Sequence, residues 1–395
     1  MDYRGRCAYG KHDIAMDNYW LIKEMGKSKL YKLITAVMAV FMLLLSACTY
    51  KPSDDNGKVD DPSQCVYYRN PVAGWRSSAD PSVIRYEGVY YAYVTSAQSP
   101  IMKSVDLVNW EDTDTVIFPS GPPKWGDGYD KVGTRNEGVW APDVVKLGDG
   151  FVFYYAHSVW GDENPGIGYA TAPHPLGPWT HRGKLFRSLE IGVNNSIDPA
   201  VFTGQDGKVY MIWGSFRGLY GVELTADGMG LMGGIDAAKK NKVLIAGMDT
   251  EEPWNVGTYE APYVIYRKGY YYLFVSTGLC CEGLSSTYEV KVSRSRNPLG
   301  PYTDDLGRDM RGTNRGYSVI RGSGKFVGTG HNSIATDDAG QDWLVYHAWE
   351  NINGTSPYRS LCLDKLNWDK LGWPSVEHNF PSTRAEVPVI NAATE

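Results

Sequence analysis

Runs of aromatic and aliphatic residues recur along the chain at a long, regular spacing. Each run opens at a Gly or Asp turn, and successive runs begin about 57–73 residues apart, at 88–96, 150–158, 207–215, 269–277 and 342–349. The stretch 270–275, Tyr-Tyr-Tyr-Leu-Phe-Val, is nearly continuous rather than alternating, which favours a strand covered on both faces of its sheet. We therefore predict one small sheet per repeat, with these runs as second strands.

Each repeat also predicts a third strand, at 101–110, 166–179, 219–224, 289–302 and 359–368. Two of these share an ending, since 175–179 reads Pro-Leu-Gly-Pro-Trp and 298–302 reads Pro-Leu-Gly-Pro-Tyr. Helical periodicity is confined to 235–241. Short strands with Gly and Pro turns at a long period predict an all-β protein, a five-bladed β-propeller.

A polar residue stands just before the first strand of four repeats, at Asp80, Asp198, Glu260 and His331. Proline follows each acid within two residues, and proline favours the first residue of a strand because it cannot donate to the sheet. The innermost strand of a blade begins at the mouth of the central channel. We therefore expect these side chains to converge there, whereas Asp143 comes two residues later in its phrase and should face differently.

Three converging carboxyl groups indicate a particular chemistry. A single Asp before Pro is usually a turn residue, but three at equivalent points of a repeat favour a shared function. Glycoside hydrolysis needs one protonated and one ionised carboxyl group on either side of the scissile bond. A third carboxylate raises the pKa of the acid by like-charge repulsion. The longer Glu260 fits the acid, Asp80 the base and Asp198 the modulator of the pKa.

The composition adds two constraints. The net charge of -6, with no Lys/Arg stripe after residue 60, argues against a nucleic-acid partner. The 28 Tyr and 13 Trp residues either fill sheets or bind sugar rings, and composition does not separate these uses. The candidate substrate contacts are residues near the ends of strands or motifs, namely Trp140, Trp160, Asn195, Ser215, Phe216 and Arg359.

The amino-terminal region predicts export. A basic stretch with Lys27 and Lys29 precedes the apolar run 33–45, which is short for a membrane span. The run ends in Leu-Ser-Ala-Cys at Cys48 and so resembles a bacterial lipoprotein signal; an ordinary secretory signal or short anchor helix is the alternative.

This interpretation divides the chain into three parts. Residues 1–48 form the signal region, with lipid attached to Cys48 and Met25 as the expected true start. Residues 49–64 form a polar, flexible tether, and 65–395 form one catalytic propeller. The expected location is the outer membrane, on the periplasmic or the cell-surface face.

Two neighbouring cysteines, Cys280 and Cys281, leave an open question. An exported protein can form disulfides, and no cysteine spacing here matches a zinc site. The pair either forms a vicinal disulfide or stays reduced.

The phrases that carry the acids resemble glycoside hydrolase family 43. They are Ser-Ala-Asp-Pro-Ser at 78–82, Val-Trp-Ala-Pro-Asp at 139–143, Ser-Ile-Asp-Pro at 196–199 and Tyr-Glu-Ala-Pro-Tyr at 259–263. The resemblance extends from about residue 70 to 374 and implies a five-bladed propeller acting by inversion on arabinose- or xylose-containing polymers. It implies Asp80 as general base, Asp198 as pKa modulator and Glu260 as general acid.

Within that family the chain most resembles the endo-1,5-α-L-arabinanases, through phrases such as Gly-His-Asn-Ser at 330–333. This implies a metal, usually Ca²⁺, held by His331 and completed by water, because calcium prefers oxygen ligands. The alternative is that His331 is a hydrogen-bonding channel residue without a metal. Ala79 replaces the histidine expected before Asp80, 312–328 lacks a glycine run, and the insertion 120–135 is placed to wall off the cleft.

These departures keep alternatives open. The first is an exo-acting α-L-arabinofuranosidase or β-xylosidase of the same family. A more remote one is a non-catalytic surface glycan-binding propeller, although such a protein does not need a buried carboxylate cluster. The expected partner is a plant-type polysaccharide such as arabinan, and the expected oligomeric state is a monomer.

Overall fold

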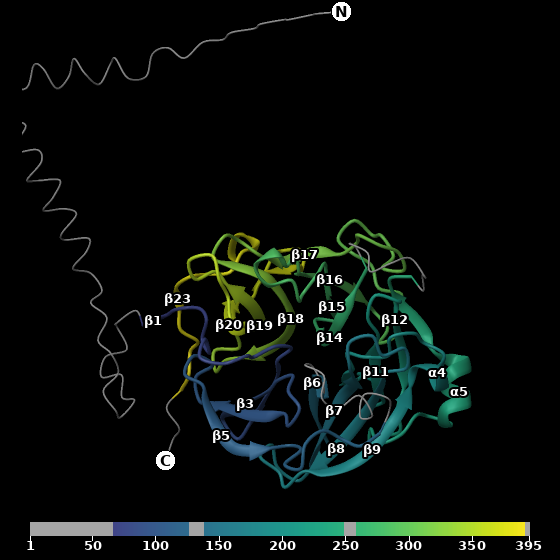
Figure 1. The fold of residues 1–395 in the computed structure, drawn as a ribbon. Coiled ribbons are helices and arrows are strands. Elements are labelled where there is room, and N and C mark those ends of the chain that lie inside the picture. Colours follow the sequence, from purple (N-terminus) through teal and green to yellow (C-terminus); the bar gives the residue numbers. More distant parts are fainter. Residues whose placement is uncertain (1–65, 126–137, 249–257, 392–395) are drawn as a thin grey trace, which may run out of the picture. The chain divides into compact units, whose positions relative to one another are not determined.

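The computed structural model describes residues 66–125, 138–248 and 258–391, and this part of the chain forms five antiparallel sheets around a central axis (Figure 1). The all-β, five-bladed prediction is confirmed. Within each sheet the strands are hydrogen-bonded in chain order. The predicted signal region and tether lie outside the described residues.

The first three blades have four strands each in the described residues. They are β2 (Ser82–Tyr86), β3 (Val89–Tyr93), β4 (Pro100–Ser104) and β5 (Glu111–Val116); β6 (Gly138–Leu147), β7 (Gly150–Ser158), β8 (Gly166–Ala172) and β9 (Thr180–Arg187); and β10 (Ala200–Thr203), β11 (Val209–Trp213), β12 (Leu219–Glu223) and β13 (Val243–Ala246).

Blade four contains four strands and blade five three, again within the described residues. They are β14 (Glu260–Arg267), β15 (Tyr270–Thr277), β16 (Glu289–Ser295) and β17 (Tyr317–Arg321), then β18 (Phe326–Thr336), β19 (Asp342–Glu350) and β20 (Arg359–Lys365). The remaining elements are β1 (Tyr67–Tyr68), paired with β23 (Ala385–Glu386); β21 (Asn367–Trp368), paired with β22 (Pro374–Ser375); and α4 (Ser188–Ile191), α5 (Gly234–Asn241), η1 (Gly283–Ser285) and η2 (Glu377–Asn379).

The predicted second strands and the helix at 235–241 are present, but the expected length of the third strands was wrong. The third strands are shorter than expected; β8, for example, ends at Ala172 rather than at 179. The fourth strands were not predicted. Strands such as β5, Glu-Asp-Thr-Asp-Thr-Val, lie at the solvent-facing edge and lack the aromatic run of the inner strands.

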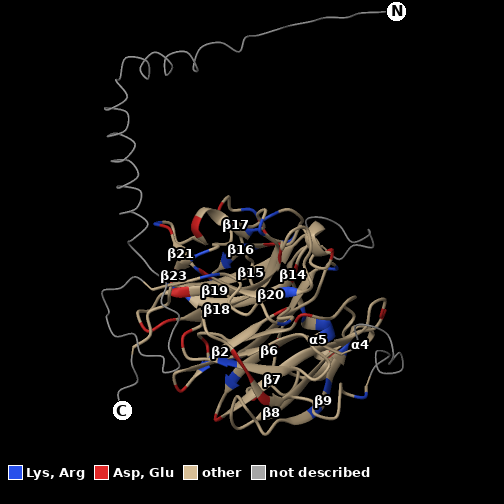
Figure 2. Ribbon diagram, turned by 60° about the vertical axis from the view of Figure 1, so that its left-hand side comes forward, with Lys and Arg blue, Asp and Glu red and all other residues tan. Residues whose placement is uncertain are grey.

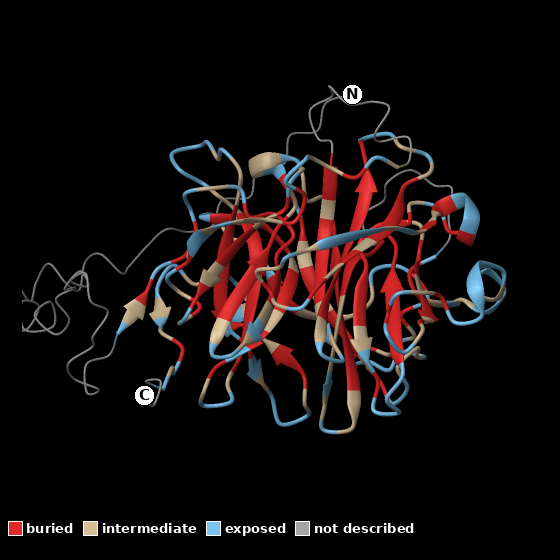
Figure 3. Ribbon diagram, turned by 90° about the horizontal axis from the view of Figure 1, so that it is seen from below, coloured by how far each residue is buried: buried red, intermediate tan, exposed pale blue. Residues whose placement is uncertain are grey.

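The hydrophobic core lies mainly between neighbouring blades. Tyr154 and Ile167 of blade two share one buried cluster with Met211 and Trp213 of blade three. Figure 3 shows the buried residues concentrated in the strands and the exposed ones in the loops. Each such side chain contributes roughly 1.5–3 kcal/mol on burial. The blades are therefore held as a rigid ring that can position side chains at the axis.

The chain closes the ring by bringing an N-terminal segment onto blade five. Ala73 forms a bridge with Leu361 of β20, and the Asn70 side chain exchanges two hydrogen bonds with the backbone of Leu363, at 2.8 and 2.9 Å. This contact joins residues almost 300 positions apart in the chain and places blade five beside blade one.

Charged residues of both signs are interspersed along the ribbon of the described part (Figure 2). None of its helices combines the length and the apolar character needed to span a bilayer.

Candidate active site

The backbone marks an equivalent position in every blade. A positive φ, uncommon for residues other than glycine, occurs at Asp80, Ala141, Asp198, Ala261 and His331, with values of 56°, 44°, 55°, 52° and 49°. The expected equivalence of the three acids therefore needs correction. Asp80, Asp198 and His331 occupy the same position of the repeat, whereas Glu260 stands one residue before it.

Side chains from neighbouring blades stabilise this unusual backbone conformation. At four of the five positions the backbone N–H donates to a side chain of the preceding blade. The pairs are Asp80 to His347 Nδ1 (3.1 Å), Ala141 to Thr95 Oγ1 (2.8 Å), Ala261 to Asp198 Oδ2 (3.0 Å) and His331 to Ser276 Oγ (2.9 Å). Strained backbone persists only where its surroundings hold it, so this hydrogen-bond ring fixes the side chains at the mouth.

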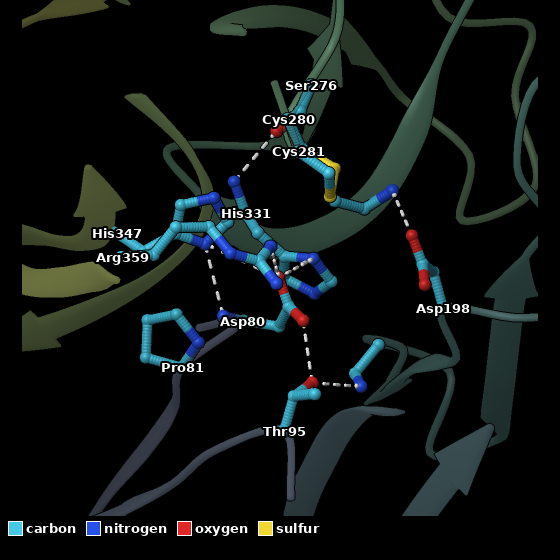
Figure 4. Close-up of polar contacts among 12 residues, drawn as sticks. Asp80, Pro81, Thr95, Asp198, Ser276, Cys280, Cys281, His331, His347 and Arg359 are labelled. Carbon is cyan, nitrogen blue, oxygen red and sulfur yellow. Dashed lines mark hydrogen bonds and ion pairs between the residues drawn. A yellow bond between two sulfur atoms is a disulfide. The ribbon is translucent and has the colours of Figure 1, made fainter. Parts of the chain in front are cut away.

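Asp80 is buried among groups that favour its charged form (Figure 4). Its Oδ2 accepts a hydrogen bond of 2.6 Å from Thr95, and its Oδ1 lies 3.1 Å from Arg359 Nη1 and 3.3 Å from His331 Nδ1. Burial raises the pKa of Asp80, but Arg359, the two nearby histidines and Thr95 together lower it well below its usual range. Asp80 is therefore ionised at neutral pH.

Of these partners, Arg359 is the permanent cation. Burial lowers the pKa of both His331 and His347, so both rings are neutral at pH 7. His347 Nδ1 accepts the Asp80 amide proton, which agrees with a neutral ring. The ionic stabilisation of Asp80 consequently comes from the guanidinium of Arg359.

Asp198 and Glu260 form a buried acidic pair whose pKa values are raised, in contrast to that of Asp80. Glu260 Oε2 accepts a hydrogen bond of 2.7 Å from Ser215, and Glu260 also bonds to Tyr288. Burial raises the pKa of both carboxyl groups, and repulsion from Glu260 and then Asp80 raises that of Asp198 further. The pair therefore keeps a proton at a pH where an isolated carboxyl group would lose it.

The structure thus brings together the three predicted acids and His331, and it separates their charge states. One carboxylate is ionised, and the neighbouring pair holds a proton. This combination supplies a base and an acid in one buried centre, as hydrolysis of a glycosidic bond requires.

The predicted substrate contacts fall into three groups. Trp140 and Trp160 lie together at the mouth, with ring centroids 5.7 Å apart, and Trp160 is 62% exposed. Three others are used by the protein itself. Ser215 bonds to Glu260, Arg359 bonds to Asp80, and the Asn195 amide donates to the Ser215 carbonyl at 3.1 Å. Phe216 is buried, so its ring presents little surface for stacking.

Sequence reasoning missed three residues that touch the acids, namely Thr95, His347 and Tyr288. For two of these residues, the position in the sequence could have indicated a role at the site. Thr95 and His347 are polar residues at the mouth end of the second-strand runs, at the level of Ser276 in blade four. Tyr288 lies against Gly330, where an added Cβ would come within 2.1 Å of the tyrosine ring.

Cys280 and Cys281 form a vicinal disulfide in the loop after β15, which answers the question left open by the sequence. The Cys280 carbonyl accepts hydrogen bonds from Trp349 Nε1 at 2.8 Å and from the Ser286 hydroxyl at 3.1 Å. The loop is thereby attached to blade five. Figure 4 shows it near Ser276 and His331.

Asp143 faces away from the acidic centre, as expected. Its Oδ2 accepts a hydrogen bond of 2.6 Å from the Val201 amide of blade three, and the residue is buried. Burial raises the pKa of Asp143 to about 7. Its carboxyl group therefore joins two blades rather than serving the mouth.

We expect Asp143 to make the protein less stable as the pH rises. Because its folded pKa of about 7 exceeds the usual 3.8, the folded state binds more protons between those values, and the free energy of unfolding falls as pH rises through 7. Asp143→Asn should remove up to about 4 kcal/mol of that loss. Urea unfolding at pH 4.5 and pH 8 measures it. The exposed Asp149→Asn is the control, and an equal loss in Asp143→Asn and the wild type would contradict the prediction.

Comparison with known proteins identifies the family. The model for glycosyl hydrolases family 43 matches residues 68–374. The chain belongs to glycosyl hydrolases family 43. It is accordingly a glycoside hydrolase, as the sequence predicted.

Relatives within family 43 are named for arabinan chemistry. The chain is 33% identical over 321 residues to an extracellular exo-α-(1→5)-L-arabinofuranosidase of Cellvibrio japonicus, which covers 75% of this chain and 86% of that protein. It is 30% identical over 302 residues to an extracellular endo-α-(1→5)-L-arabinanase of Bacillus subtilis, with the same two coverages. The solved structure of Cellvibrio cellulosa α-L-arabinanase complexed with arabinohexaose matches with a TM-score of 0.67 at 32% identity, covering 77% of this chain and 96% of that one.

Proposed function

We propose that this family 43 enzyme is an inverting hydrolase of α-1,5-L-arabinan that cuts within the chain. The observation that carries the mechanism is the opposite direction of the pKa shifts. The surroundings lower the pKa of Asp80 and raise the pKa values of Asp198 and Glu260. The substrate class follows from the similarity to relatives named arabinanases and arabinofuranosidases. In this proposal Glu260 is the general acid and Asp80 the general base. Asp198 shares the buried acidic pair with Glu260 and acts as the modulator of its pKa.

In the proposed mechanism each proton transfer belongs to one group. Glu260 gives its proton to the glycosidic oxygen as the bond from that oxygen to the anomeric carbon breaks. Asp80 accepts a proton from a water molecule whose oxygen attacks the anomeric carbon from the opposite face, so the product has inverted configuration. Ser215 and Tyr288 orient Glu260, and Arg359 keeps Asp80 ionised. Trp140 and Trp160 supply aromatic surface for a sugar ring.

The products formed from linear α-1,5-arabinan test the proposal. An endo-acting enzyme releases a ladder of oligomers early in the reaction, because it enters the polymer at any bond. We expect such a ladder when early samples are separated by size. Free arabinose without intermediate oligomers would contradict internal cleavage.

An exo-acting α-L-arabinofuranosidase is the second candidate, favoured by the 33% identity to the Cellvibrio japonicus exo-enzyme. The chain also departs from the arabinanase phrase, because Ala79 stands where a histidine is expected before Asp80. The insertion 120–135, on which a wall across the cleft was predicted, lies mostly outside the described residues. If the protein is instead a β-xylosidase, it should release xylose from xylo-oligosaccharides. The same separation of products, with xylo-oligosaccharides as the substrate, tests this alternative.

The proposal includes a cation beside His331. Among the described residues no three His, Cys, Asp or Glu side chains gather as metal ligands, so the protein itself does not provide an oxygen-rich calcium cage. The residues fit only an ion that takes one imidazole nitrogen from His331 and completes its shell with water. No proton transfer above depends on it. Elemental analysis before and after treatment with a chelator tests whether Ca²⁺ is bound.

We further propose that the protein is exported and anchored by lipid at Cys48. The relatives named as extracellular support export. Labelling with radioactive palmitate, lost in Cys48→Ser, tests the anchor, and light scattering of the purified protein tests the expected monomer.

A further inference from the structure

An exposed tryptophan on the mouth side of the propeller has no part in the mechanism above. Trp75 is 49% exposed. Among the tryptophans in the described residues, only Trp75 and Trp160 are exposed. Most others in this part of the chain pack in the core. Trp160 follows β7 at the mouth end of the propeller.

The segment that carries Trp75 is connected directly to the catalytic centre. The Ser78 amide donates to the Arg359 carbonyl at 2.8 Å, and the Arg359 guanidinium bonds to Asp80. On its other side, the Tyr358 hydroxyl donates to the Gly74 carbonyl at 2.8 Å. Trp75 therefore lies on the rim between blades five and one, five positions before the proposed base.

The indole of Trp75 is restrained on one side by its neighbour Arg76. The Arg76 guanidinium carbon lies 5.7 Å from the centroid of the ring, and Arg76 is itself held by an ion pair with Asp112 of β5. The bridge between Ala73 and Leu361 fixes the backbone on the N-terminal side. A ring that is already restrained loses less conformational entropy on binding than a free one.

We propose that Trp75 is a binding platform for a sugar residue of the polysaccharide, distant from the bond that is cut. Sugar rings present C–H groups on one face, and these pack on the flat face of an indole, burying apolar surface on both. The platform extends the substrate cleft along the rim between blades five and one and favours long chains over short ones. This inference rests on the proposed function and names a specificity determinant for it.

Trp75→Ala tests the platform when arabinan and arabinotriose are compared as substrates. Loss of the stacking contact should raise KM for the polymer about three- to tenfold, with kcat and the kinetics on the trimer unchanged. Trp75→Phe should restore most of the polymer affinity. The matched control is Tyr266→Ala, because Tyr266 is 42% exposed and lies at the far end of β14, about 20 Å along the strand from Glu260.

Three results would overturn the platform. One is an unchanged KM for the polymer in Trp75→Ala, and another is an equal loss on polymer and trimer, which would indicate damage to Asp80 through Arg359. A third is an equal effect of Tyr266→Ala. These results are separable from failure of the proposed function. A wild type that cleaves xylo-oligosaccharides but not arabinan refutes the substrate, and Trp75 is then judged by the same ratio on xylan and xylotriose. A wild type inactive on both refutes the function and this inference together.

Discussion

Glu260→Gln is expected to reduce turnover of arabinan by about 10²–10⁴-fold, because the leaving oxygen then receives no proton as the bond breaks. Substrate affinity should change little, since the amide preserves the size of the side chain and the hydrogen bond accepted from Ser215. The decisive measurement compares arabinan with an aryl arabinofuranoside whose phenolate leaves without protonation. On that substrate most of the lost rate should return.

A second carboxylate outside the centre provides the control. Glu223 lies on β12 in an ion pair with Lys208, and Glu223→Gln should leave both substrates unaffected. If Glu260→Gln lost the same factor on the two substrates, Glu260 would not be the acid.

Asp80→Asn is expected to lower turnover by about 10²–10⁴-fold on both substrates, because the attacking water loses the group that accepts its proton. A good leaving group does not compensate for a missing base. On the aryl substrate, Glu260→Gln should therefore regain most of its turnover, whereas Asp80→Asn should not. NMR of the first product formed by the wild type should show inversion at the anomeric carbon. Retention would instead make Asp80 a nucleophile.

Asp143→Asn is the matched control for Asp80→Asn. Asp143 is also buried, within the first strand of its blade, but its carboxylate bonds to the Val201 amide of the next blade. Turnover by this variant should equal that of the wild type at a pH where both are folded. A comparable loss in the two variants would assign the effect of Asp80→Asn to the disturbed ring of blades.

Much of the fold could be predicted from the sequence, because a propeller repeats the same short sequence pattern in successive blades. An aromatic run follows a polar residue and proline in blade after blade, and such runs form inner strands whatever lies around them. The outer strands gave no comparable signal. Strand β5 is rich in Asp and Thr and is held by pairing with β4 rather than by its own pattern.

Within the candidate site, the sequence by itself located Asp80, Asp198, Glu260 and His331 and indicated that they meet, because each was expected just before a first strand. The structure places Asp80 and Asp198 before β2 and β10, but Glu260 is the first residue of β14 and His331 lies within β18. Their charge states were decided by the tertiary structure. Asp80 is ionised because ring closure brings Arg359 to it from 279 positions away, and Glu260 is oriented by Ser215 of the preceding blade. The pKa of a carboxyl group depends on burial and on charges a few ångströms away. Those neighbours come from other blades, so only the closed ring could decide that Asp80 is ionised while the Asp198–Glu260 pair keeps a proton.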